Sequence, residues 1–301
     1  MNERKGILFV LATAVISGVS IYVNSLGIKF ANPYVFTGMK NLLVGFALFS
    51  LIMALKEWKS LKAVTKKQWW QLALIGLIGG AIPFLLFFKG LSMTIGAKGG
   101  FIHKTVFLYV ALLAIIFLKE KMNKSLLLGL GVLMAGNILF LGIKPQGLTW
   151  GDGLIFLATL FWAVEIIISK KALQQLSARV VAWGRMFFGA MFIMLFLIST
   201  NQLGAVFVYN PEQWKWIAIT SVFLFDYVFT FYHGLKYVRA SVATAVLALG
   251  APITGMVTLI AKEGIVWAPH KIWGLVLIFT GIAFVIGWKT LHEVLRFKKV
   301  T

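Results

Sequence analysis

Long apolar segments alternate with short charged segments along the whole chain. Each apolar segment approaches the length of about 20 residues that an α-helix needs to cross a hydrocarbon core about 30 Å thick. Because that core offers no water to backbone N–H and C=O groups, a segment embedded in it forms a helix. The pattern predicts an all-α, polytopic membrane protein with ten transmembrane helices. The expected helices span residues 6–26, 33–55, 69–90, 97–118, 125–142, 151–170, 180–200, 213–234, 240–261 and 271–288.

The positions of the basic residues predict how these helices are oriented. The chain holds 29 lysines and arginines against 9 acidic residues, which is a net charge of +20. In a soluble protein this charge would suggest nucleic acid as a partner, but here most of the basic residues lie in the loops on the side of the N-terminus. Lysine and arginine are enriched in cytoplasmic loops. We therefore expect a multi-pass protein of the cytoplasmic (inner) membrane, with both termini cytoplasmic, the lipid bilayer around it and no nucleic-acid partner.

Composition and the lack of familiar motifs restrict the chemistry. The chain has no cysteine, which excludes disulfides, thiolate nucleophiles and cysteine-bound metals. It contains no HExxH zinc motif, no phosphate-binding glycine loop and no nucleophile elbow. We therefore expect no catalytic residues, no metal and no cofactor. A membrane-embedded enzyme acting on a lipid-linked substrate and a passive channel are the alternatives to a carrier.

The second half of the chain repeats features of the first. Residues 11–13 (LAT) recur as residues 157–159, and residues 87–91 (FFKGL) recur as residues 231–235 (FYHGL). Three glycines recur with the same spacing in the fifth and tenth expected helices, namely Gly129, Gly136 and Gly142, then Gly274, Gly281 and Gly287. Since a unit of five helices enters the membrane upside down in its second copy, we predict a 5+5 inverted repeat with units at residues 1–146 and 147–301.

These features make the sequence similar to the ten-helix EamA group of the drug/metabolite transporter superfamily. The resemblance rests on the 5+5 arrangement, on residues 118–122 (LKEKM), on the glycines of the fifth and tenth helices and on Pro252. Tyr109 stands where the partner of Pro252 would lie, and His103 and Lys104 are not part of the family pattern. The resemblance implies a cavity lined by helices one, three, four, six, eight and nine. It also implies a monomer, or a homodimer through helices five and ten.

Ionisable residues inside the expected helices are the candidates for function, because an ionised group facing lipid costs several kcal/mol. Counted at 1.5 Å per residue, Lys40 and Lys104 lie roughly 10 Å from the outer helix ends, and Glu165 and Asp226 lie roughly 20 Å from them. Several of the ionisable residues in these helices have an alternative, structural explanation. Lys40 and Arg185 could extend to the interface, His103 could be a packing residue, and either acid could pair with Arg185.

Hydroxyl and aromatic residues complete the candidate site. Ser17 and Asn24 lie on the polar face of the first expected helix, while Trp162 shares a helix face with Glu165. The candidate substrate-binding residues are Lys104, His103, Tyr109, Trp162, Lys40, Arg185, Ser17 and Asn24, and the candidate proton-coupling residues are Glu165 and Asp226. The predicted function is a secondary transporter that moves a small polar metabolite by alternating access, with proton coupling or exchange. The excess of cations favours a substrate with a carboxylate or phosphate.

Overall fold

The computed structural model describes residues 3–142, 147–262, 268–287 and 292. All regular structure in these residues is helical, and ten spans are long and apolar enough to cross a membrane. The prediction of an all-α protein with ten transmembrane helices is confirmed. The spans run over Glu3–Phe30, Pro33–Ala54, Lys66–Leu91, Gly96–Leu118, Lys124–Leu141, Trp150–Ala172, Ala178–Ser199, Pro211–Tyr237, Ala240–Ala261 and Pro269–Ile286. Their ends lie within four residues of the expected ones; the expected end of the tenth, residue 288, lies outside the described residues.

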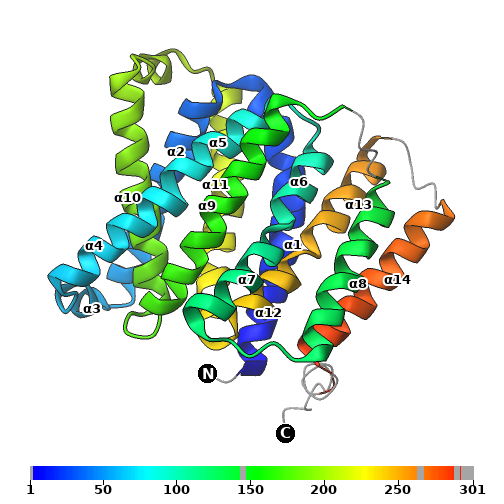
Figure 1. Ribbon diagram of the computed structural model, residues 1–301. Coiled ribbons are helices and arrows are strands. Elements are labelled where there is room, and N and C mark those ends of the chain that lie inside the picture. The colour runs from blue at the N-terminus through cyan, green and yellow to red at the C-terminus, as the bar shows by residue number, and fades with distance from the viewer. Residues whose placement is uncertain (1–2, 143–146, 263–267, 288–291, 293–301) are drawn as a thin grey trace, which may run out of the picture.

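Seven spans are single α-helices that run through the bundle (Figure 1). They are α1 (Glu3–Gly27), α2 (Pro33–Ala54), α8 (Lys124–Leu141), α9 (Trp150–Ala172), α10 (Ala178–Ser199), α11 (Pro211–Tyr237) and α14 (Pro269–Ile286). Three short elements extend or link them: η1 (Ile28–Phe30), α3 (Trp58–Lys62) and η3 (Leu203–Val208). We call the end of the bundle at which α1 begins the N-face, and the other end the opposite face.

The other three spans are interrupted. The third consists of α4 (Lys66–Ile75), the π-helical η2 (Gly76–Ala81) and α5 (Ile82–Leu91). The fourth consists of α6 (Gly96–Lys104) and α7 (Val106–Leu118), and the ninth of α12 (Ala240–Leu247) and α13 (Gly250–Lys262).

Proline explains two of these interruptions. Pro83 lacks the N–H that would bond to the Gly79 carbonyl four residues earlier, and the π-helical turn lies directly before it. Pro252 follows the interruption of the ninth span. The fourth span is interrupted at Thr105 without a proline. Thr105 precedes Leu249, within the ninth-span interruption, by 144 residues, so the two interruptions occupy equivalent positions of the sequence repeat.

Helices α8 and α14 pack side by side at one edge of the bundle (Figure 1). Glycines form their contact: a Cβ added at Gly274 would lie 2.5 Å from the Phe140 backbone nitrogen, and one at Gly281 would lie 2.7 Å from the Leu133 backbone nitrogen. Glycine permits such close helix approach in membranes. The glycine faces of the two helices are thus used within one chain. The expected homodimer through these helices stays a prediction, and it would have to use their outer faces.

Candidate functional site

A cavity of about 80 Å³ lies at the centre of the bundle. It is lined by residues from α1, α2, α5, α6, α7, α9, α10, α11 and α12. The helices implied by the family resemblance contribute to this lining, and the second and seventh spans, α2 and α10, contribute as well. A buried water needs roughly 10–15 Å³ of such space, so the cavity accommodates several waters or a small solute.

Most of the candidate residues meet in this cavity. Those that line it are Ser17, Asn24, Lys40, His103, Lys104, Trp162, Glu165 and Arg185. Two candidates are not part of the lining. Tyr109 packs edge-on against Phe156, with ring centroids 5.9 Å apart, and Asp226 is half-buried on α11. The structure therefore separates Asp226 from Glu165, and the roles expected of Asp226 and Tyr109 stay predictions.

Lys40 is held in the interior by an amide and two aromatic rings. Its side chain is 1% exposed, and its ammonium donates a hydrogen bond to the Asn24 side-chain oxygen. The same nitrogen lies 4.8 Å from the centre of the Phe36 ring and 4.2 Å from the centre of the Phe88 ring. These distances suit cation–π contacts. Lys40 does not extend to the interface.

Lys104 of the interrupted fourth span packs against the interrupted ninth span. It is 2% exposed, and its Nζ donates a hydrogen bond of 2.6 Å to the Ser17 hydroxyl. Its side chain lies over Gly250, where an added Cβ would be 2.7 Å from the lysine Cε. Lys104 ends α6 and Gly250 begins α13, so the breaks in the fourth and ninth spans face each other beside the cavity. Ser17 and Asn24, two turns apart on α1, each bind one of the two buried lysines.

Glu165 is bound by two hydroxyl groups. The Tyr232 hydroxyl donates to Glu165 Oε1 at 2.5 Å, and the Ser169 hydroxyl donates to the same oxygen. Within the described residues no ion pair joins Arg185 to Glu165 or to Asp226, so the alternative of a structural ion pair is not what the structure holds. The Tyr232 bond links α11 to α9, whereas Ser169 lies on α9 itself, four residues after Glu165. Neither hydroxyl was predicted from sequence as a partner of Glu165.

Arg185 and Trp162 converge on one backbone carbonyl. Arg185 Nη2 donates to the Gly79 oxygen at 3.0 Å, and Trp162 Nε1 donates to it at 2.9 Å. Pro83 leaves this carbonyl without its helical partner, and a buried carbonyl requires another donor. The Gly79 carbonyl was missed from sequence. The signal that could have found it is the proline four residues later.

Two buried polar atoms of the lining have no partner in the described protein. They are Nδ1 of His103 and Nε of Arg185. The His103 ring lies against Trp162 and Phe87, with centroids 4.6 Å and 5.4 Å away. Buried polar atoms are nearly always hydrogen-bonded, so unpartnered ones beside a cavity indicate that water or a ligand completes their bonding. Among the described residues of the lining, the cationic side chains of Lys40, Lys104 and Arg185 stand against one carboxylate.

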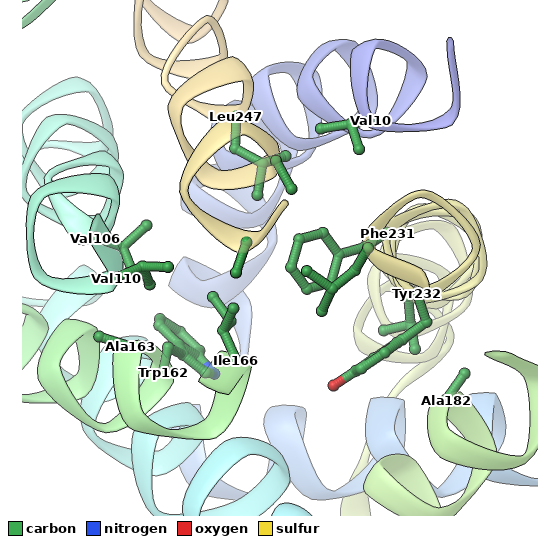
Figure 2. Close-up of a cluster of buried hydrophobic side chains, with 14 of the residues drawn as sticks. Val10, Val106, Val110, Trp162, Ala163, Ile166, Ala182, Phe231, Tyr232 and Leu247 are labelled. Atoms are coloured by element: carbon green, nitrogen blue, oxygen red, sulfur yellow. The ribbon is translucent and has the colours of Figure 1, made fainter. Parts of the chain in front are cut away.

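An apolar layer separates the cavity from the N-face (Figure 2). Val106, Ile166, Phe231 and Leu247 line the cavity, and the direction in which their helices run places them toward the N-face. Further toward the N-face, Val10 of α1 and Val110 of α7 are fully buried. In Figure 2 these side chains from α1, α7, α9, α11 and α12 point toward one another, and the Tyr232 hydroxyl points into the interior. The layer closes the N-face side by packing rather than by charge.

The chain matches the model of the EamA-like transporter family twice, over residues 4–142 and 149–287. It belongs to the EamA-like transporter family. The EamA model thus covers each half of the chain once, as the 5+5 architecture requires. The function class of this EamA protein is membrane transport.

Curated relatives and a solved structure are similar to this EamA protein. The uncharacterized transporter YetK of Bacillus subtilis (strain 168) is 25% identical over 299 residues, which covers 95% of this chain and 86% of YetK. Protein LicB of Haemophilus influenzae is 24% identical over 238 residues, covering 72% of this chain and 80% of LicB. A crystal structure with 16% identity has the same fold, with a TM-score of 0.73 over 97% of this chain and 99% of the other. Relatives named as transporters are consistent with a protein that is not an enzyme.

Proposed function

We propose that this EamA protein is a secondary transporter that carries a small solute with a carboxylate or phosphate group across the cytoplasmic membrane by alternating access. The observation that carries the proposal is the pair of unpartnered donors in the cavity, His103 Nδ1 and Arg185 Nε, beside Lys40 and Lys104. The His103 tautomer that protonates Nδ1 makes all four groups donors toward an anion. The N-face is cytoplasmic in this proposal, because most basic loop residues lie there.

The cavity favours a compact anionic or zwitterionic substrate. Its free space suits a metabolite of a few heavy atoms, such as a small organic acid or an amino acid. Lys104 and Lys40 already have one partner each on α1, so an anion would share their remaining N–H donors rather than replace those bonds. An ammonium ion has three donors, which permits this sharing. The substrate would thereby be held between α1, α2, α6 and α10.

Glu165 is the proposed proton carrier. A carboxylate accepts hydrogen bonds at both oxygens, whereas the protonated acid becomes a donor at one of them. Both hydroxyls donate to Oε1, so a proton that binds Oε2 would weaken the bonds to Tyr232 on α11 and Ser169 on α9 by removing the negative charge of the acceptor. This would loosen the contact between two helices that wall the cavity. Proton binding and helix movement are linked in this way, whether the carrier works as a symporter or as an exchanger.

Proteoliposomes that contain the full chain test this proposal. Uptake of organic acids, amino acids and organic cations is measured with and without a proton gradient, for the wild type and for Glu165→Gln, Asp226→Asn and Lys104→Gln. We expect Glu165→Gln to abolish accumulation driven by the gradient while exchange continues, and Lys104→Gln to lower the affinity for anions. Unchanged accumulation in both amide variants would show that neither acid couples transport. Transport of bare cations alone would overturn the anionic substrate.

A further inference from the structure

A second and larger cavity, of about 680 Å³, opens at the N-face. Its walls are the N-terminus of α4, the C-termini of α7 and α9, and the link between α11 and α12. All of these elements belong to spans that also line the central cavity. We call this cavity the vestibule. Its volume lies in the range of sites for small molecules, about 300–1,000 Å³.

The vestibule is strongly basic. Among the described residues, five cations and one carboxylate line it, namely Lys67, Lys119, Lys170, Lys171, Arg239 and Glu120. Glu120 is occupied by the start of α12: it accepts bonds from the Ala240 backbone nitrogen at 2.7 Å and from the Ser241 hydroxyl at 2.5 Å. This acid is therefore bonded to the start of α12 and, within the described residues, forms no ion pair with the lysines.

Two of these cations bind backbone carbonyls, and the other three do not. Lys170 Nζ donates to the Leu235 and Val238 carbonyls, at 2.6 Å each, and Arg239 donates to the Lys121 carbonyl at 3.1 Å. Lys67, Lys119 and Lys171 are exposed, and within the described segments none of their ammonium groups makes a hydrogen bond or an ion pair. The Lys171 ammonium lies 5.9 Å from the centre of the Phe117 ring. Lys67 and Lys171 belong to the third and sixth spans, and Lys119 directly follows the fourth.

Helix dipoles do not neutralise this charge. Each helix end contributes about half an elementary charge, negative at a C-terminus and positive at an N-terminus. Three C-termini (α7, α9 and α11) and two N-termini (α4 and α12) border the vestibule, which leaves about half a negative charge. The excess of four positive side chains is several times larger. Lysines that served only to orient the protein in the membrane would have no reason to gather around a cavity.

We propose that the vestibule is an anion-binding site that holds a phosphate or carboxylate group at the N-face through Lys67, Lys119 and Lys171. A concave wall with one sign of charge focuses the field and raises the local concentration of ions of the other sign. The site would supply anions to the central cavity when the apolar layer opens, and this role alone rests on the proposed function. The binding itself does not depend on transport. The group could belong to a soluble anion or to an anionic lipid headgroup.

Thermal unfolding of the full chain in phosphatidylcholine nanodiscs tests the site, with inorganic phosphate as the probe and chloride at equal ionic strength as the reference. The wild type is compared with the triple variant Lys67→Gln, Lys119→Gln, Lys171→Gln. The matched control replaces three exposed lysines of the same face that are outside the vestibule: Lys59→Gln, Lys121→Gln, Lys124→Gln. We expect phosphate to raise Tm for the wild type and the control, and this rise to be lost in the vestibule variant.

Equal phosphate effects in the two triple variants, or no effect in the wild type, would overturn the proposal. Nanodiscs that also contain phosphatidylglycerol separate the two sources of the anionic group. If lipid headgroups occupy the site, this lipid raises Tm for the wild type, removes the phosphate effect and leaves the vestibule variant unchanged. If the site takes soluble anions, the phosphate effect persists. Because no transport is measured, failure here is distinguishable from failure of the proposed transport function.

Discussion

Two helix crossings at opposite ends of the bundle have the same backbone arrangement and different side-chain chemistry. At the opposite face α5 crosses α9, and a Cβ added at Gly90 would lie 2.6 Å from the Gly151 carbonyl oxygen. At the N-face α1 crosses α11, and a Cβ added at Gly234 would lie 3.0 Å from the Gly6 carbonyl oxygen. The glycines correspond across the sequence repeat, since Gly234 follows Gly90 by 144 residues.

The surroundings of the two crossings differ. Beside the α5–α9 crossing, Asp152 binds Lys98 at 2.6 Å and accepts a hydrogen bond from Thr94 at 2.7 Å. Beside the α1–α11 crossing, Val10 and Val238 are buried next to the glycines, and no described ion pair joins the two helices. The repeat thus conserves how the helices approach, while each end is closed by its own interactions. We expect the opposite face to respond to charge and the N-face to respond to packing.

The largest effect is expected from placing a side chain in the contact between the glycines. A Cβ at Gly151 would meet the Gly90 oxygen at 2.7 Å, so Gly151→Val must push α5 away from α9. Overpacking of this kind costs about 1–3 kcal/mol or more. Gly153→Val in the same helix is the control, because nothing lies within 4 Å of that position. Thermal unfolding of the purified variants measures the difference. Gly234→Val should behave like Gly151→Val, and if it is tolerated the two crossings are not equivalent.

Removal of the ion pair should open the opposite face. Asp152 is 3% exposed and Lys98 is 20% exposed, so Asp152→Asn should weaken closure by less than the loss of a fully buried pair. We expect the free energy that favours the closed opposite face to fall by about 1.4 kcal/mol, which is a tenfold change in the ratio of open to closed protein. The chain has no cysteine, so a single Ser20→Cys reports access to the cavity. Its labelling by a membrane-impermeant maleimide added from the opposite face should rise about tenfold.

The control for this variant is Glu212→Gln at the same face. Glu212 and Lys215 form an exposed pair at 3.5 Å, and exposed pairs contribute little. Labelling should not change in this control. Equal labelling of Asp152→Asn and the wild type would show that the ion pair does not hold the opposite face closed.

A polar group in the apolar layer should open the N-face by a smaller amount. Val110 is 0% exposed, and Val110→Thr places a hydroxyl of similar size in the layer. The new hydroxyl can bond the carbonyl four residues earlier, as the Thr13 and Thr159 hydroxyls do, so burying it costs about 1 kcal/mol at most. This corresponds to a rise of up to roughly fivefold in labelling of Ser20→Cys from the N-face. Val15→Thr is the control, because Val15 is 53% exposed on the outside of α1. Increased labelling from the opposite face instead would contradict the assignment of this layer to the N-face side.

The smallest effect is expected from salt. Raising ionic strength from about 0.1 M to 1 M shortens the screening length from about 10 Å to 3 Å. Because Lys98 is partly exposed, labelling from the opposite face should rise about twofold at most. With an uncharged membrane-impermeant maleimide, which the basic vestibule does not attract, labelling from the N-face should stay constant, since the apolar layer holds no charge. A salt response at the N-face alone would reverse the comparison between the two ends.

The ten spans, their approximate ends and the repeat follow from the sequence alone. Hydrophobic length is a local property, and the membrane requires a helix wherever that length suffices. Pro83 and Pro252 also predict kinks in the third and ninth spans from sequence, because a proline lacks the backbone N–H of a helical hydrogen bond. The depth of Lys40, Lys104 and Glu165 also follows, because the rise per residue of a helix is constant.

Only the tertiary structure decided which of these residues meet. Sequence gives the depth of a residue along its helix, but the rotation of the helix and its neighbours depend on the packing of the whole bundle. For this reason Glu165 and Asp226, at similar depth, differ in place: Glu165 lines the cavity and Asp226 does not. The same packing brings Tyr232 to Glu165 across α11 and α9. It also interrupts the fourth span at Thr105, where no proline marks the break.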